Sequence, residues 1–382
     1  MLLERVNHMH PKLFKLEAFF EKFEHEPDMI VLGASDVESF KVGELLALPG
    51  EKLDLADLSL QYDRVTGNKE LRHQVARSYG LPDENILITN GASEAILLAM
   101  HAEPGPGESA LVCHPAYQGL AEMAKTAGAT VERYEYREAD GFAPDLELIR
   151  KRLDESPPKL LLLNSPHNPT GQVLSETDLK DLFDRAKTAG TRVIVDEVFH
   201  GIWIDHDPVP SATGLSKDVV VIGCLSKVYG LPGLRIGWLA GPEEFITRCK
   251  ELRYYTSLTA PSVVQQLGEI AVRHRDEVLQ RGRSNVAANY KYAVEWLSLH
   301  SEIFDYVKPQ GGTVMLLKFK PRVDTKTFAE RLARKHKVFL VPCAWTFDTA
   351  EGYLRLGLGL NPAEFARGLD GLDSYLSQEG WK

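Results

Sequence analysis

Residues 160–196 read LLLLNSPHNPTGQVLSETDLKDLFDRAKTAGTRVIVD, and the pattern of this stretch indicates the fold class. It begins with a short apolar run at Leu160–Asn164 and ends with another at Arg192–Asp196, and a helical pattern covers Glu176–Ala189 between them. Two apolar strands joined by a helix form a βαβ unit, in which the strands run parallel. Both strands are almost wholly apolar, as is typical of a sheet that helices cover on both faces.

The same alternation continues toward both ends of the chain. Further apolar runs at Ala110–Cys113 and Val219–Gly223 predict strands, and helical patterns separate the runs. Repetition of strand and helix predicts an α/β fold with a mostly parallel, doubly wound sheet wrapped by helices. The other helical patterns of this part cover Ser93–Ala102, Tyr117–Ala127 and Asp145–Leu153.

After Trp238 the pattern changes to long charged helices at Glu243–Lys250 and Ser262–Leu299, followed by short strands. This change predicts a second, smaller α+β unit. Its strands are expected at Gly311–Phe319, Val338–Pro342 and Gly352–Gly357, and its helix at Lys326–Lys335. The expected division is residues 1–45 as a segment of the small domain or a cover of the active site, 46–245 as the large domain, and 246–382 as a connecting helix and the small domain.

Composition excludes several classes of protein. The 382 residues are 44% hydrophobic and 26% charged, which is typical of a globular chain, and no apolar run is long enough to span a bilayer. A net charge of −10 without a basic block disfavours nucleic acid as a partner. The N-terminal residues do not resemble a signal peptide, so a cytoplasmic location is expected. The four cysteines stand singly, which predicts buried thiols and no metal site.

Polar residues stand where open α/β sheets bind ligands, at the carboxyl ends of strands and the N-termini of helices. Residues 90–93 (Asn-Gly-Ala-Ser) precede a helix and offer backbone N–H groups and a hydroxyl to an anion. Asp196 ends one strand, Lys227 follows another, and Arg235 lies eight positions later (235 − 227 = 8). Each alone has an ordinary structural explanation as a cap, a turn residue or a surface charge. Their order in the sequence and their shared location must therefore decide whether their role is structural or functional.

Three motifs give the sequence a resemblance to a known family. Residues 165–171 (SPHNPTG), 196–198 (DEV) and 226–237 (SKVYGLPGLRIG) resemble the signature segments of the class I/II aminotransferases. The resemblance extends over roughly residues 61–360. It implies pyridoxal 5′-phosphate (PLP) as cofactor, the PLP-dependent transferase fold type I with a large and a small domain, and a homodimer with shared active sites.

The resemblance also implies roles for individual residues. Lys227 forms the Schiff base and acts as general acid and base, and Asp196 pairs with the pyridinium nitrogen, so that the ring accepts electrons from Cα. Arg355 binds the α-carboxylate of the substrate through a planar fork. The other implied cofactor contacts are Gly91, Ala92, Ser93 and Arg235 at the phosphate, Asn168 at the phenolic oxygen, Tyr117 on the ring face, and Tyr62 at the phosphate of the neighbouring subunit.

Two positions depart from the family pattern. Phe199 stands where the family usually has a tyrosine that donates to the phenolic oxygen, and Cys224 replaces a serine or threonine at the phosphate. A thiol is a weak donor, and Ser226 either replaces it or has only a structural role. With phenylalanine at position 199, the sequence also resembles a narrower branch of the family, that of capreomycidine synthase and the enduracididine-forming cyclase. This branch acts on hydroxylated arginine. Glu17 is the candidate partner for the guanidinium group, with a solvent-facing helix charge as the equal alternative.

Two reactions therefore stay open at this point. The first is elimination of the hydroxyl of a hydroxylated arginine, followed by ring closure through a guanidine nitrogen to a cyclic guanidino amino acid. The second is transamination between an amino acid and a 2-oxo acid, which the same residues serve. A PLP-binding transcriptional sensor is rejected. Such proteins carry a DNA-binding domain ahead of the PLP domain, whereas here the PLP pattern begins within the first hundred residues. We expect an amino acid as substrate, and neither nucleic acid nor membrane as partner.

Overall fold

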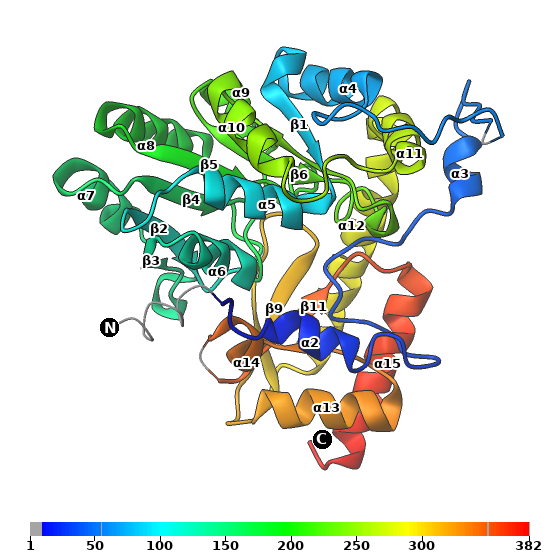
Figure 1. Cartoon of the computed structure of the whole chain (residues 1–382). Coiled ribbons are helices and arrows are strands. Elements are labelled where there is room, and N and C mark those ends of the chain that lie inside the picture. The colour runs from blue at the N-terminus through cyan, green and yellow to red at the C-terminus, as the bar shows by residue number, and fades with distance from the viewer. Residues whose placement is uncertain (1–9, 55, 350, 382) are drawn as a thin grey trace.

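A computed structural model describes residues 10–54, 56–349 and 351–381 of the chain. Two β-sheets organise these residues, a seven-stranded sheet in the large part of the molecule and a four-stranded antiparallel sheet in the small part (Figure 1). This arrangement confirms the predicted fold class, a mostly parallel sheet wrapped by helices with a smaller α+β unit.

The large sheet has the strand order β1-β7-β6-β5-β4-β2-β3. All its strands run parallel except β7, which pairs antiparallel with β1 and β6. The four strands predicted here match β2, β4, β5 and β6 to within one residue at each end. The strands are β1 (Ile86–Thr89), β2 (Ser109–His114), β3 (Thr130–Glu135), β4 (Leu160–Asn164), β5 (Arg192–Asp196), β6 (Val220–Cys224) and β7 (Gly237–Ala240).

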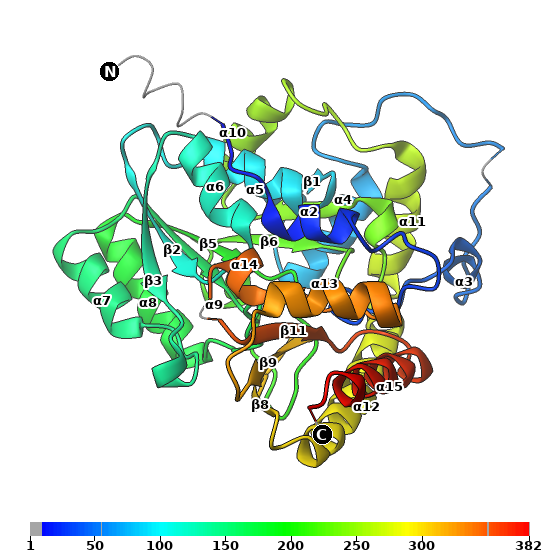
Figure 2. The same cartoon turned by 90° about the horizontal axis from the view of Figure 1, so that it is seen from below.

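Helices cover both faces of this sheet, with α5 and α6 on one face and α7, α8 and α9 on the other (Figures 1 and 2). Their ends follow local sequence signals. The Ser175 hydroxyl accepts from the backbone N–H of Asp178 at the start of α8, and Gly190 ends that helix with a φ of 71°. The helices of this part are α4 (Lys69–Tyr79), α5 (Gly91–Ala102), α6 (Gln118–Thr126), α7 (Leu146–Glu155), α8 (Glu176–Ala189), α9 (Ala212–Leu215) and α10 (Glu243–Arg253).

The carboxyl ends of β4, β5 and β6 lie side by side, because these strands are parallel neighbours. Asn164 and Asp196 are register partners at the ends of β4 and β5, and Cys224 ends β6. The N-terminus of α5 reaches the same edge. A Cβ on Gly237 would lie 2.5 Å from the carbonyl carbon of Gly91, so only glycine lets β7 approach this turn closely. Strand ends and a helix N-terminus thus converge at one edge.

The small sheet has the order β10-β11-β9-β8, and its neighbours are antiparallel. Its predicted strands are present but begin one to three residues later, while β8 and α15 were not predicted. The predicted helical region Ser262–Leu299 divides at His274 into two helices. None of the helices in the described residues is long and apolar enough to cross a membrane. The elements are α11 (Ser262–Arg273), α12 (Arg275–Leu299), β8 (Phe304–Val307), β9 (Val314–Phe319), α13 (Thr325–His336), β10 (Val341–Pro342), α14 (Cys343–Phe347), β11 (Tyr353–Gly357) and α15 (Pro362–Gln378).

The N-terminal segment packs against the small sheet and lies beside the large one. Ile30 forms a parallel bridge with Val338. Figures 1 and 2 both show α2 between the α5–α6 side of the large sheet and helices α13 and α14. Phe19 fixes α2 there, with its ring centroid 5.2 Å from that of Phe339 and 5.7 Å from that of Trp345. The segment contains α2 (Lys15–Glu21) and α3 (Val42–Leu46).

Candidate active site

A cavity of about 760 Å³ lies where the strand ends, the N-terminus of α5, helix α2 and the small sheet meet. Among the residues that the sequence predicted for the site, all except Gly91 and Tyr62 line this cavity. Gly91 adjoins it beneath the guanidinium of Arg235. Tyr62 is 83% exposed and lies outside the cavity of its own chain. The lining residues that were predicted are Glu17, Ala92, Ser93, Tyr117, Asn168, Asp196, Ser226, Lys227, Arg235 and Arg355.

Asp196 provides a buried carboxylate at the floor of the cavity. Its Oδ1 accepts from the backbone N–H of Val198 (3.1 Å), whereas Oδ2 has no hydrogen bond among the residues that the structure describes. Burial raises the pKa of Asp196 to about 7, and the nearby Glu197 carboxylate adds to the increase. A buried carboxylate that lacks a cationic partner on one oxygen suits a protonated ring nitrogen. This geometry fits the pyridine end of PLP.

A second group of residues fits the phosphate end. Gly91 has a φ of 75°, and a Cβ there would lie 2.4 Å from Nη2 of Arg235. Arg235 itself adopts the left-handed conformation, and its Nη1 lies 3.4 Å from Oγ of Ser226. The first backbone N–H groups of α5, a helix of twelve residues, have no partner within the helix. Helix N-terminal N–H groups, a hydroxyl and a guanidinium in one place suit the binding of a phosphate.

Arg355 stands on β11 and is 1% exposed. Its Nε and Nη2 donate to the carbonyl oxygen of Gly33 (3.2 and 2.9 Å), and its Nη1 donates to Oδ1 of Asn168 (3.2 Å). Burial lowers the pKa of Arg355 to about 10, so the guanidinium is cationic at neutral pH. It has no carboxylate within ion-pair distance in the described part of the chain. A buried cation that faces the cavity without an acidic partner fits a substrate carboxylate.

Tyr117 lies on the α6 side of the cavity, where its ring contacts Phe14 with centroids 5.0 Å apart. Burial raises the pKa of Tyr117 to about 12, so its hydroxyl is protonated. His167 packs in the interior and does not line the cavity: it is fully buried and stacks on Tyr136 with the ring centroids 3.8 Å apart. Its Nε2 lies 2.8 Å from the carbonyl oxygen of Pro115, which ties together the loops that carry Tyr117 and Asn168.

Glu17 is an exposed residue of α2 and is one of the residues that line the cavity. The described residues give its carboxylate no hydrogen bond and no ion pair. Its negative charge raises the pKa of both Tyr117 and Arg355, so the carboxylate lies within electrostatic reach of these two groups. Glu17 is therefore part of the cavity wall and not only a charge on the outer face of the helix.

The cavity also contains residues that the sequence did not indicate. Asp36 is the most important of them, because its Oδ1 lies 3.8 Å from Nζ of Lys227. No motif links Asp36 to that lysine, and only the fold brings them together. Phe199, which the sequence did single out, lines the cavity as an apolar ring. All four cysteines are free thiols and are buried, as predicted.

Comparison with known proteins identifies the family of the chain. The family model described as "Aminotransferase class I and II" matches residues 29–372. Capreomycidine synthase of Streptomyces vinaceus is 31% identical over 349 residues, which cover 90% of this chain and 89% of the relative. The 3-methylarginine biosynthesis aminotransferase ArgM of Streptomyces arginensis is 28% identical, with 83% and 85% covered. The crystal structure of the PLP-dependent cyclase OrfR is 28% identical with a TM-score of 0.88, and the match covers 97% of this chain and 98% of that one. The chain therefore belongs to the aminotransferase class I and II family and is a PLP-dependent enzyme.

Proposed function

We propose that the protein is a lyase that removes the hydroxyl of a hydroxylated arginine and closes a ring through a guanidine nitrogen, giving a cyclic guanidino amino acid. The observation that carries this proposal is the pair of opposite charges in the cavity wall. Arg355 offers a cation to the α-carboxylate, and Glu17 offers a carboxylate to a cationic side chain. An amino acid with a guanidinium group complements both.

In this proposal PLP, when bound, supplies an electron sink for the pair of electrons at the substrate Cα. Lys227 holds the cofactor and moves the Cα proton, and Asp196 keeps the ring nitrogen protonated from its buried position. Gly91, Ala92, Ser93, Ser226 and Arg235 would bind the phosphate. Asn168 would contact the phenolic oxygen, and Tyr117 would pack on the ring.

Three similar proteins support the cyclisation. Capreomycidine synthase and the cyclase OrfR match most of the chain, and the name of ArgM refers to an arginine derivative. Phe199 adds a local reason. Because its ring has no hydroxyl, the phenolic oxygen of the cofactor would lose the donor that the usual tyrosine provides, which would alter the electronic state of the ring.

We also infer a homodimer in which Tyr62 reaches the phosphate of the neighbouring subunit. In the single chain the Tyr62 ring is 83% exposed, and Leu60 two residues earlier is equally exposed. Large exposed apolar side chains close together favour an interface with another copy. The division of the chain into an N-terminal segment (1–45), a large domain (46–245) and a connecting helix with the small domain (246–382) likewise remains a proposal.

The test is incubation of the purified holoenzyme with hydroxylated arginine in the absence of any 2-oxo acid. The expected product has lost one water and contains a new ring, which mass spectrometry and NMR identify. An absolute requirement for a 2-oxo acid acceptor would contradict the proposal.

Transamination is the second candidate, and the match to ArgM, itself named an aminotransferase, supports it. The same lysine, aspartate and arginine serve this reaction. Conversion of the cofactor to its pyridoxamine form after addition of an amino donor alone, seen in the absorption spectrum, would favour transamination over cyclisation.

A further inference from the structure

Residues 33–40 run beside the segment that carries Lys227. The backbone N–H of Val37 donates to the carbonyl oxygen of Lys227 (3.2 Å), and the N–H of Phe40 donates to the carbonyl oxygen of Gly230 (3.0 Å). These two bonds fix the register of the segments. The residue before Val37 is therefore held next to the catalytic lysine.

Two glycines make this close approach possible. A Cβ on Gly230 would lie 2.6 Å from the carbonyl oxygen of Glu38, and a Cβ on Gly359 would lie 2.3 Å from the carbonyl oxygen of Asp36. The Glu38 N–H also donates to the carbonyl oxygen of Gly359 (2.8 Å). The backbone at Asp36 is thus enclosed between the lysine loop and the chain that follows β11, where any larger residue would clash.

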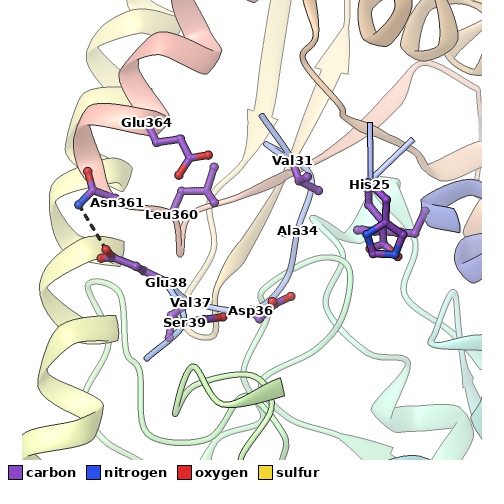
Figure 3. Close-up of a pocket in the computed structure, with 12 residues that line it drawn as sticks. His25, Val31, Ala34, Asp36, Val37, Glu38, Ser39, Leu360, Asn361 and Glu364 are labelled. Atoms are coloured by element: carbon purple, nitrogen blue, oxygen red, sulfur yellow. Dashed lines mark hydrogen bonds and ion pairs between the residues drawn. The ribbon is translucent and has the colours of Figure 1, made fainter. Parts of the chain in front are cut away.

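The side chain of Asp36 faces Lys227. Its Oδ1 lies 3.8 Å from Nζ, and about a third of each side chain is exposed, 32% for Asp36 and 33% for Lys227. Figure 3 shows the adjoining pocket, in which Glu38 is turned toward Asn361 and Asp36 points the other way. The residues that the structure describes offer Asp36 no hydrogen bond and Lys227 no second carboxylate. Asp36 is thus the carboxylate within ion-pair distance of Nζ in the described residues, although its charge also raises the pKa of Arg355.

A lysine that moves protons needs a group to hold it when it is detached from the cofactor. In that state Nζ is a free amine on a flexible stem, and it becomes an ammonium when it takes a proton. In the proposed function Asp196 pairs with the ring nitrogen and Glu17 with the guanidinium group of the substrate, and neither lies within ion-pair distance of Nζ among the described residues. Asp36 is the carboxylate that remains beside Nζ.

We propose that Asp36 is a positioning residue that holds the Lys227 amine, and its ammonium form, at the substrate Cα. The C–H bond at Cα breaks, its electron pair stays with the substrate, and its proton bonds to Nζ. The ammonium then pairs with the Asp36 carboxylate. Where the hydroxyl stands on the carbon next to Cα, the electron pair forms the new C=C bond, the C–O bond breaks, and Nζ returns the proton to the departing oxygen as water. This last step rests on the proposed function, whereas the first is common to transamination.

The test compares D36N and D36E with wild type, with E364Q as the matched control. Glu364 lines the adjoining pocket in Figure 3, so E364Q removes a negative charge nearby without touching Lys227. Exchange of the Cα proton of arginine in deuterium oxide is followed by NMR at saturating arginine. Arginine lacks the hydroxyl, so exchange requires no elimination. PLP affinity is measured by titration of each apoprotein, and the position of Nζ is read from crystals of apo wild type and apo D36N.

The exchange rate falls at least about tenfold in D36N, as expected for a group that supports general acid–base transfer. D36E recovers part of the rate, E364Q keeps all of it, and PLP affinity is unchanged. In the apo crystals, Nζ lies within about 4 Å of residue 36 in wild type and leaves that position in D36N. Wild-type exchange in D36N, a rise in KM alone, or an unmoved Nζ would overturn the proposal. A wild type that exchanges but does not cyclise hydroxylated arginine contradicts the proposed function and leaves the role of Asp36 standing.

Discussion

Replacing Asp196 by asparagine should stabilise the apoprotein at neutral and alkaline pH, although the carboxylate is expected to be essential in the holoenzyme. The reason is its burial: the side chain is 3% exposed, and burial raises its pKa from 3.8 to about 7. In the folded apoprotein the carboxyl therefore keeps its proton up to about pH 7. In the unfolded chain it loses the proton near its ordinary value.

The sign and size of the effect follow from proton linkage. Between about pH 4 and pH 7 the folded state binds more protons than the unfolded state, so wild-type stability falls as pH rises and levels off above about pH 7. At 1.36 kcal/mol per pH unit, the loss is about 4 kcal/mol. D196N escapes this loss. The free energy of unfolding of D196N should equal that of wild type at pH 4 and exceed it by up to about 4 kcal/mol at pH 8.

The assay is denaturant unfolding of both apoproteins at a series of pH values, with D370N, an exposed position on α15, as the control. Added PLP should make wild type the more stable of the two proteins. PLP stabilises a protein by binding its folded state, and it is expected to bind folded wild type more tightly than folded D196N. A D196N apoprotein that is less stable than wild type at pH 8, or a difference in stability that does not change with pH, would show that Asp196 does not titrate in this way.

Three further substitutions test the remaining parts of the site. R355K should raise KM for the amino acid about 10- to 100-fold with unchanged PLP affinity, since hydrogen bonds to a charged group contribute about 1.5–3 kcal/mol. An unaltered KM in steady-state kinetics would show that the Arg355 guanidinium does not bind the carboxylate. E17Q should raise KM for hydroxylated arginine about tenfold, whereas E21Q, on the same helix but outside the cavity, should not; equal effects would remove Glu17 from substrate recognition. G91A should weaken PLP binding about tenfold, because a φ of 75° is strained for alanine and the new Cβ would displace Arg235; a titration that matches wild type would contradict the packing described here.

The central part of the fold could be predicted from the sequence, because buried parallel strands are apolar runs. Leu160–Asn164 and Arg192–Asp196 were predicted with correct ends. The strand β3 was missed because it lies at the sheet edge and is partly exposed, so it has no apolar run. The strands β1 and β7 were missed because four residues are too few to show a period.

The site could be predicted where its residues belong to continuous motifs. Lys227 and Arg235 lie in one segment, and the strand ends placed Asp196 in the same region. Asp36 could not be found in this way, because its position depends on pairing between segments far apart in the chain. The same holds for Glu17, whose direction is decided by the packing of α2 on the small sheet.

The most direct test of the whole account is reduction of the purified holoenzyme with borohydride, followed by digestion and mass spectrometry. We expect a phosphopyridoxyl group on the peptide that contains Lys227 and on no other lysine, and we expect K227A to lose the visible absorption of the imine. An adduct on a different lysine, or a K227A protein that keeps that absorption, would contradict it.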